Sequence, residues 1–228
     1  MNNCNEKQFE LYNCDCLELI HSQNLIGKNI CIVTDPPFNV GYNYKSYKDN
    51  LPEDEYFSFL ETVLTSHGFP FVVIHYPEAL YKLSFQVGMF PEKVVSWVYN
   101  SNTAKQHRDI AFFRVKPDFK KVRQPYKNPN DKRIKERIAN GSMGGRLYDW
   151  WNINQVKNVS KKDCIHPCVM PVEVMKNIIG ILPEEYIIFD PFMGAGTTAV
   201  ACKELGRKFI GCELDSDYFQ FAKKRLEE

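Results

Sequence analysis

Residues 30–38 read Ile30-Cys31-Ile32-Val33-Thr34-Asp35-Pro36-Pro37-Phe38, an apolar run that stops at two prolines. A short run of branched apolar residues predicts a buried strand, and a proline holds the residue before it in an extended conformation. Asp35 then lies at the carboxyl end of a strand, where open α/β sheets bind their ligands. A carboxylate, two rigid prolines and an aromatic ring within four residues are suited to hold a flat ring that bears an amine. The alternative is an ordinary turn that ends a strand.

A second motif near the C-terminus reads Phe189-Asp190-Pro191-Phe192-Met193-Gly194-Ala195-Gly196-Thr197-Thr198 and joins a predicted strand to a predicted helix. Glycines let a ligand approach the backbone, and the helix start offers free N–H groups. The Lys-Ser/Thr ending of a Walker A loop and the GxGxxG spacing of dinucleotide sites are both missing. The next predicted strand ends at Glu213, where an acid can accept both hydroxyls of a ribose. These residues predict a site for a non-phosphorylated adenosine derivative, with S-adenosylmethionine as the first candidate; the alternative is a helix-capping glycine loop beside a surface glutamate.

Strand-like and helix-like segments alternate on both sides of a region that has no periodicity. We expect strands over 9–13, 30–33, 71–74, 94–98, 110–115, 186–189 and 208–213, and helices over 15–20, 53–64, 172–181, 194–205 and 217–226. This alternation predicts an α/β fold, a mostly parallel sheet with helices on both faces. We divide the chain into a catalytic half (1–115), an insertion (116–162) and a cofactor-binding half (163–228).

The composition is that of a soluble globular protein, with 44% hydrophobic and 25% charged residues among 228. No apolar run approaches the roughly 20 residues that span a bilayer, so we expect no membrane partner. Eight cysteines without a secretory signal favour a reducing compartment, the cytoplasm. Cys164-Ile165-His166-Pro167-Cys168 lacks a second pair of ligands at zinc spacing, so we predict no metal.

Positive charge is concentrated in one segment. Residues 105–137 contain 12 Lys and Arg against 4 Asp and Glu, an excess of +8, while the whole chain carries only +1. Such a segment is typical of polyanion binding. Large aromatic residues within the insertion argue against a plain linker, although a solvated basic face remains the alternative for most of its lysines.

The combined order of these motifs resembles the S-adenosylmethionine-dependent DNA amino-methyltransferases, and more narrowly their β group, in which the catalytic motif precedes the cofactor motif. The resemblance rests on Asp35-Pro36-Pro37-Phe38, the downstream basic insertion, His166-Pro167 with Pro171, and the Asp190–Thr198 motif followed by Glu213. It covers nearly the whole chain apart from the insertion. It implies a Rossmann-like methyltransferase fold with a small basic target-recognition insertion.

The resemblance also implies roles for individual residues. Asp35-Pro36-Pro37-Phe38 would hold the target amine, Phe192, Gly194 and Gly196 would line the methionine end of the cofactor, Glu213 would bind its ribose, and Asp15 would meet its adenine. The full set expected to bind S-adenosylmethionine is Asp15, Cys16, Asp35, His166, Pro167, Asp190, Phe192, Gly194, Gly196, Thr197, Thr198, Glu213 and Leu214.

The expected reaction follows from the chemistry of an exocyclic amine. Its lone pair is delocalised into the ring, and two acceptors, the Asp35 carboxylate and the Pro36 carbonyl, would free that lone pair. Phe38 would stack on the extruded base, a contact worth roughly 1–3 kcal/mol. The family usually has Tyr where this chain has Phe38, so stacking is kept and a hydroxyl is lost; we expect activity to persist. Asp at the first motif position is typical of adenine-N6 enzymes, whereas cytosine-N4 enzymes more often have Ser.

Double-stranded DNA is the expected substrate, and the insertion is the expected recognition element. The phosphate contacts are assigned to Lys120, Lys121, Arg123, Lys127, Lys132, Arg133 and Arg137. The segment His107-Arg108-Asp109, just before a predicted strand, is expected either to line the target-base pocket or to form a structural ion pair. A restriction endonuclease as functional partner and a homodimer are further expectations. The rival functions are cytosine-N4 methylation, methylation of RNA or protein amines, and a cofactor- or DNA-binding regulator weakened in catalysis.

Overall fold

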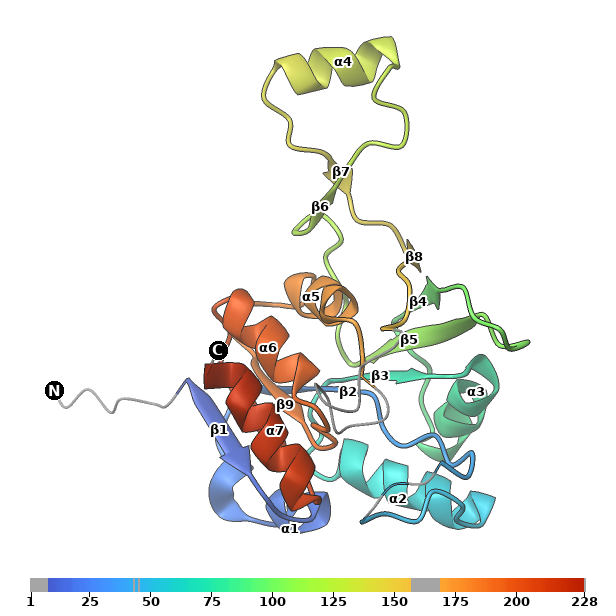
Figure 1. Ribbon diagram of the computed structural model, residues 1–228, viewed down its shortest axis with the longest axis vertical. Helices are drawn as coiled ribbons and strands as arrows, with labels where there is room; N and C mark the ends of the chain where they lie inside the picture. Colours follow the sequence, from blue (N-terminus) through green and yellow to red (C-terminus); the bar gives the residue numbers. More distant parts are fainter. Residues whose placement is uncertain (1–7, 43, 45, 157–168, 228) are drawn as a thin grey trace, which may run out of the picture.

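The computed structural model describes residues 8–42, 44, 46–156 and 169–227. Its main sheet has eight strands in the order β1-β10-β9-β2-β3-β5-β4-β8 (Figure 1). These strands are β1 (Phe9–Tyr12), β2 (Ile30–Thr34), β3 (Phe71–His75), β4 (Lys93–Val98), β5 (His107–Phe113), β8 (Trp150–Asn152), β9 (Ile187–Asp190) and β10 (Phe209–Cys212). A separate ribbon pairs β6 (Arg123–Gln124) with β7 (Gly145–Arg146).

The strand directions bring the two sequence motifs to one edge of the sheet. Strands β1, β10, β9, β2 and β3 are parallel, so the carboxyl ends of β2 and β9 lie together. Strand β5 is antiparallel to both β3 and β4. The amino end of β5 therefore lies at the same edge, next to the carboxyl end of β3. The chain order is circular, because the C-terminal strands β9 and β10 fit between β1 and β2.

Helices cover both faces of this sheet (Figure 1). One face packs against α1 (Cys16–Ile20), α2 (Glu53–Thr65) and α3 (Pro77–Gln86), and the other against α5 (Val172–Gly180), α6 (Thr197–Glu204) and α7 (Ser216–Glu227). A short 3-10 helix, η1 (Gln23–Leu25), follows α1. All five residues of β2 are buried, Cys31 and Val33 on the α5–α7 side and Ile30 and Ile32 on the other. This two-sided burial explains why the strand is a continuous apolar run.

The sequence prediction of a mostly parallel, doubly covered α/β sheet is confirmed. The helix expected after Pro171 does begin at Val172, and it ends at Gly180 before Pro183. Helix α3 and helix α4 (Lys132–Ala139) were not expected. Among the described residues, none of the helices combines the length and the apolar character that crossing a bilayer requires.

The insertion forms an arm that projects from the sheet, with α4 at its far end (Figure 1). The chain leaves the sheet after β5 and returns at β8, which pairs with β4. Trp151 in β8 is buried, whereas Trp150 is 48% exposed. Residues 150–152, inside the expected insertion of 116–162, therefore belong to the main sheet.

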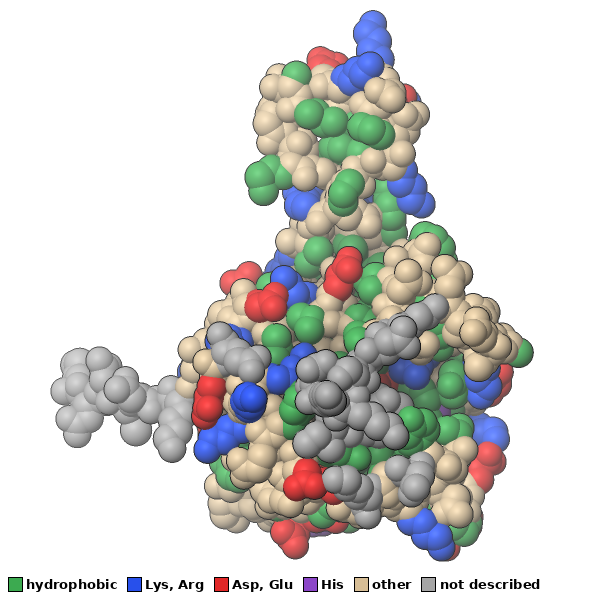
Figure 2. Space-filling view, in the orientation of Figure 1, with side chains coloured by type: hydrophobic (Ala, Val, Ile, Leu, Met, Phe, Trp, Pro, Cys, Tyr) green, Lys and Arg blue, Asp and Glu red, His purple; other side chains and the backbone are tan. Residues whose placement is uncertain are grey.

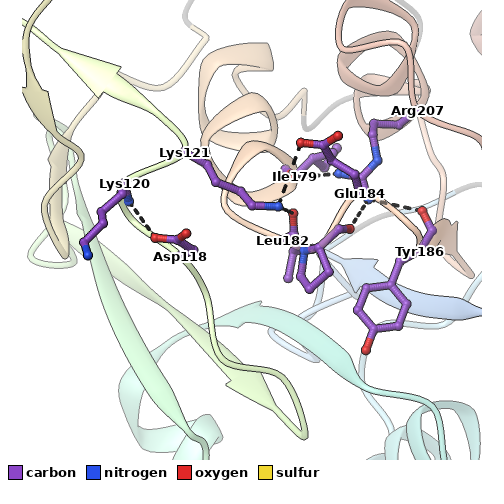
Figure 3. A network of polar contacts seen from close by, with 9 residues as sticks. Asp118, Lys120, Lys121, Ile179, Leu182, Glu184, Tyr186 and Arg207 are labelled. Carbon is purple, nitrogen blue, oxygen red and sulfur yellow. Dashed lines mark hydrogen bonds and ion pairs between the residues drawn. The ribbon is translucent and has the colours of Figure 1, made fainter.

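The base of the arm is held against α5 by polar contacts (Figure 3). The Asp118 N–H donates to the Ile181 carbonyl at 2.8 Å, and the Lys121 ammonium donates to the Leu182 carbonyl at 3.3 Å. Arg207, almost fully buried, donates to the carbonyls of Ile179 and Tyr186 from beneath. These contacts fix the point from which the arm extends.

Candidate active site

A cavity of about 330 Å³ lies at the sheet edge where β2, β9 and β10 end. Its volume is within the range of small-molecule sites. It brings the two sequence motifs together although about 150 residues of chain separate them. The predicted site residues that line it are Asp15, Cys16, Asp35, Pro36, Pro37, Phe38, Asp190, Phe192, Gly194, Thr197, Thr198, Glu213 and Leu214. His166 and Pro167 lie outside the described residues.

Asp190 anchors the loop between β9 and α6. Its carboxylate accepts hydrogen bonds from the Thr34 hydroxyl at 2.7 Å, the Thr198 hydroxyl at 2.5 Å and the Phe192 N–H at 3.1 Å. Burial raises the pKa of Asp190 to about 6, against the lowering effect of these donors. With three donors on a buried carboxyl group, Asp190 joins β2 to the loop and shapes the cavity wall.

Glu213 is held in place by two backbone N–H groups. One oxygen accepts from Gly194 at 2.8 Å and the other from Asp215 at 2.9 Å. Each carboxylate oxygen can accept a second hydrogen bond, so both remain able to bind a ligand hydroxyl. Burial raises the pKa of Glu213 above its ordinary value, while the two N–H groups lower it.

Gly196 has a different place from the one the motif implied. It does not line the cavity but forms the N-cap of α6 with φ of +76°. A Cβ there would lie 2.8 Å from the Cβ of Ala222 in α7. The absence of a side chain at Gly196 therefore lets α7 pack against the start of α6.

Asp15 caps α1 and lines the cavity. One of its oxygens accepts from the Leu17 N–H at 2.7 Å, which holds the carboxylate at the start of the helix. Cys16 follows it and is buried. Acids from two separate β-strand ends, Asp15 after β1 and Glu213 after β10, thus border one cavity.

Asp35 presents an acceptor that has no hydrogen-bond partner. Among the residues that the structure describes, nothing donates to its buried Oδ1. Its Oδ2 lies 3.7 Å from the Nη1 of Arg108, an ion pair on the catalytic motif. Burial raises the pKa of Asp35 to about 7, Arg108 lowers it, and the nearby charge of Asp190 raises it further. Of the segment His107-Arg108-Asp109, Arg108 lines this cavity and pairs with Asp35, whereas the Asp109 carboxylate accepts from the Ser96 hydroxyl at 2.9 Å.

The two prolines of the motif differ in what their carbonyls contact. The Tyr56 hydroxyl donates to the Pro37 carbonyl at 2.6 Å and lies 2.9 Å from the Nε2 of His75. The Nδ1 of His75 accepts from the Tyr76 N–H at 2.8 Å, which assigns the ring proton to Nε2. Burial lowers the pKa of His75 to about 3, so the ring is neutral. This chain of hydrogen bonds occupies the Pro37 carbonyl, whereas no described residue donates to the Pro36 carbonyl.

Phe38 packs against the same histidine. The two ring centroids lie 4.3 Å apart with the planes 20° from parallel, and the Tyr76 ring meets Phe38 edge-on at 5.0 Å. The position of the aromatic ring is thus fixed by β3 and the residue after it. Neither Tyr56 nor His75 was predicted as a site residue, because each lies within an apolar pattern typical of core.

The loop after the motif was also missed. Its centre is Asp49, which is 3% exposed and accepts from the N–H groups of Asn39, Val40 and Tyr42. Ser46 in this loop donates to Asp215 at 2.7 Å, across the cavity from β2. An isolated Asp in a polar stretch gives no sequence signal for such a role, since it depends on a folded loop.

The predicted DNA-binding residues belong to the arm, on which Figure 2 shows several Lys and Arg side chains. All seven are exposed to solvent: Lys120, Lys121, Arg123, Lys127, Lys132, Arg133 and Arg137. Lys121 also contacts the Leu182 carbonyl and Glu184 at the base of the arm (Figure 3), which gives it a structural role there. Lys127 lies over the ring of Tyr148 at 4.7 Å. Asp131 caps α4 and so orients the basic residues at the far end.

The chain matches the family described as DNA methylase over residues 30–224, most of its length. The chain belongs to this family. A Type II methyltransferase from Haemophilus parainfluenzae, M.HpaI, is 30% identical over 218 residues, which is 86% of this chain and 67% of that protein. The chain spans about two thirds of the length of such curated relatives.

Solved structures agree with the DNA methylase fold. The PvuII DNA methyltransferase, titled cytosine-N4-specific, has a TM-score of 0.65 at 19% identity and covers 98% of this chain and 90% of its own. The complex of M1.HpyAVI with SAM has a TM-score of 0.58 at 23% identity and covers 96% of this chain and 100% of its own. At these identities the likeness concerns the fold.

Proposed function

We propose that this DNA methylase transfers a methyl group from S-adenosylmethionine to the exocyclic N6 of adenine in duplex DNA, at a specific sequence. The observation that carries the proposal is the joint cavity of the two motifs. Asp35, with a buried oxygen that lacks a partner, borders the same space as Gly194 and Glu213. A target amine that donates N–H to Asp35 and a cofactor whose nucleoside lies at Glu213 can therefore meet in this cavity.

The residues present fit S-adenosylmethionine. Glu213 has two oriented oxygens for ribose hydroxyls, and Asp15 offers a second acidic edge to the cavity. Among the described residues, the cavity is lined mostly by apolar and acidic side chains, and its one cation, Arg108, pairs with Asp35. When bound, the cofactor supplies an electrophilic methyl group on its sulfonium sulfur.

The chain's own residues prepare the amine. Asp35 Oδ1 and the Pro36 carbonyl accept its two hydrogens, which draws the nitrogen out of conjugation and frees its lone pair. Both acceptors are held before the base arrives, Asp35 by the proline turn and the adjoining segment by the bond from Tyr56 to Pro37. Such preorganised groups need no rearrangement during the reaction. A carboxyl group with a pKa of about 7 is also suited to take up the proton that the methylated amine releases.

Adenine is favoured over cytosine by Asp at the first position of the motif, where relatives that modify cytosine more often have Ser. The arm supplies the DNA contacts in this proposal. Its exposed cations neutralise phosphates, and polar side chains such as Arg123 and Gln124 reach base edges. The proposal includes a restriction endonuclease that acts on the same sequence as the functional partner. It also includes assembly of the chain into a homodimer.

The deciding experiment is transfer of tritium from methyl-labelled S-adenosylmethionine to duplex DNA, followed by analysis of the nucleosides. We expect the label in N6-methyladenine. Label in N4-methylcytosine would show that cytosine is the target base and would leave the rest of the proposal unchanged. Cofactor binding without label in DNA would overturn it and favour RNA or protein as substrate, or a regulator. Mapping of modified bases in DNA from cells that express the chain then identifies the recognised sequence.

A further inference from the structure

A guanidinium group lies inside the candidate active site. Arg108 is the second residue of β5, and the antiparallel pairing of β5 with β3 brings it beside the end of β3. Its Nη1 lies 3.7 Å from Asp35 Oδ2, and its Cζ lies 4.6 Å from the centroid of the Phe38 ring. Three further rings surround the Cζ at 5.4–5.9 Å: Trp97, Tyr99 and Tyr76. The side chain is only 16% exposed.

These contacts are of the same kind as those expected of the target base. A guanidinium is planar, stacks on aromatic rings and donates N–H groups to carboxylates. The base is also planar, would stack on Phe38 and would donate an amine N–H to Asp35. Two groups with the same requirements cannot occupy the same place.

One of the groups that already touch Phe38 must therefore give way to a stacked base. His75 touches it at 4.3 Å but is 2% exposed and hydrogen-bonded at both ring nitrogens. Moving His75 would leave the Tyr56 hydroxyl and the Tyr76 N–H without their partner. Arg108, the second residue of β5, has a long and flexible side chain, so it is the group that can move.

We propose that Arg108 occupies the target-base position in the absence of DNA and is displaced when the base enters. The inference rests on the proposed function and deepens it. Until displacement, the guanidinium lowers the pKa of the Asp35 carboxyl and so favours the ionised form, which can accept the amine. Arg108 is thus a positioning residue, which acts through Asp35 and leaves before the reaction.

The charged and titratable groups around Asp35 predict how the loss of Arg108 changes the pKa of Asp35. Among the described residues these are Arg108 from β5, Asp190 from β9, Tyr56 from α2 and Tyr99 after β4. Arg108 is the cation of this set and lowers the pKa of Asp35, whereas Asp190 and burial raise it. Removing the guanidinium leaves only the raising influences, so Asp35 in the free enzyme will titrate at a higher pH.

The test is the pH dependence of methyl transfer by Arg108→Met, with saturating S-adenosylmethionine and varied duplex DNA carrying the mapped sequence. The acidic limb of kcat/KM reports the enzyme before DNA binds, and that of kcat reports the DNA complex. We expect the kcat/KM limb to move up by about one pH unit or more, the effect of losing an opposite charge at this distance. The kcat limb stays at the wild-type pH, because no guanidinium lies beside Asp35 in the DNA complex of either the wild type or the variant.

Two further variants sharpen the test. Arg108→Lys keeps the charge but cannot stack as a planar group, so its kcat/KM limb stays near the wild-type pH while KM for DNA falls several-fold. This variant also serves if Arg108→Met does not fold. Lys105→Met removes a neighbouring cation, which lies 3.7 Å from the Tyr76 ring, and is expected to move neither limb.

Equal shifts of both limbs in Arg108→Met would place the guanidinium beside Asp35 in the DNA complex and overturn the inference. No shift in either limb, or a raised KM for DNA in Arg108→Lys, would overturn it as well. In those cases the wild-type chain still transfers methyl, and the proposed function stands. Absence of transfer by the wild-type chain would overturn both.

Discussion

At the scale of single residues, the site depends on one carboxyl group in an unusual state. Asp35 combines a buried oxygen without a partner and a pKa raised to about 7. Asp35→Asn keeps the shape but replaces an acceptor oxygen by an amide that can donate. We expect methyl transfer to fall about 10²–10³-fold, the loss typical of one preorganised hydrogen-bond partner, with cofactor affinity unchanged. Single-turnover transfer and equilibrium binding of S-adenosylmethionine measure the two. Asp54→Asn, the same change on an exposed residue of α2, is the control.

The same pKa predicts the sign of two pH effects. The ionised form is the acceptor, so the wild-type kcat/KM for DNA, which reports the free enzyme, should fall as the pH drops through about 7. The free energy of unfolding changes with pH in the opposite direction to the rate. Folding raises the pKa of Asp35, so its neutral form favours the folded state. This contribution is complete below the ordinary carboxyl pKa and is lost as the pH rises through about 7. Asp35→Asn, which stays neutral, should therefore not unfold more easily than the wild type at pH 8 in a urea titration; a lower midpoint there would contradict this account.

At the scale of elements, the glycine-containing turn serves packing as well as binding. Gly196→Ala places a Cβ 2.8 Å from Ala222 at a residue with φ of +76°. We expect a loss of about 2–4 kcal/mol in the free energy of unfolding, from left-handed strain together with overpacking. Gly206→Ala, at φ of +66° with nothing within 4 Å, carries the strain alone and should lose about 1 kcal/mol. Urea unfolding of both variants measures the difference; equal losses would contradict the packing role of Gly196.

Elements with a continuous or periodic apolar pattern were predictable, and those without one were not. Strands β2, β3 and β9 are apolar runs because helices cover both of their faces. Helix α3 was missed because two of its large hydrophobic residues, Tyr81 and Phe85, are 74% and 90% exposed, which blurs its periodicity. Helix α4 buries no residue, so its sequence resembles a solvated loop.

At the scale of the whole molecule, the arm carries the proposed DNA-binding residues of α4 away from the sheet (Figure 1). Replacing Lys132 and Arg133 by Gln removes two cations from α4. We expect weaker DNA binding and a salt dependence, log K against log salt, shallower by up to about 2, with kcat unchanged. The matched control replaces the exposed Lys223 and Lys224 of α7. An equal effect of the control pair would indicate that net charge, rather than the arm, attracts DNA.

The sequence alone predicted the proposed chemistry, from an Asp-Pro-Pro-Phe motif at a strand end, a glycine-containing turn, an acidic residue after the next strand and a basic insertion. These are local patterns, because each is formed by residues that are close together in the chain. Tertiary structure alone decided which groups share a space. It occupied the Pro37 carbonyl with Tyr56, assigned Gly196 to helix packing and brought Arg108 onto Asp35. Each of these contacts joins residues that are separated in the chain. The pairing of β2, β3 and β5 brings Arg108 to Asp35, and the packing of α7 against the start of α6 brings Ala222 to Gly196.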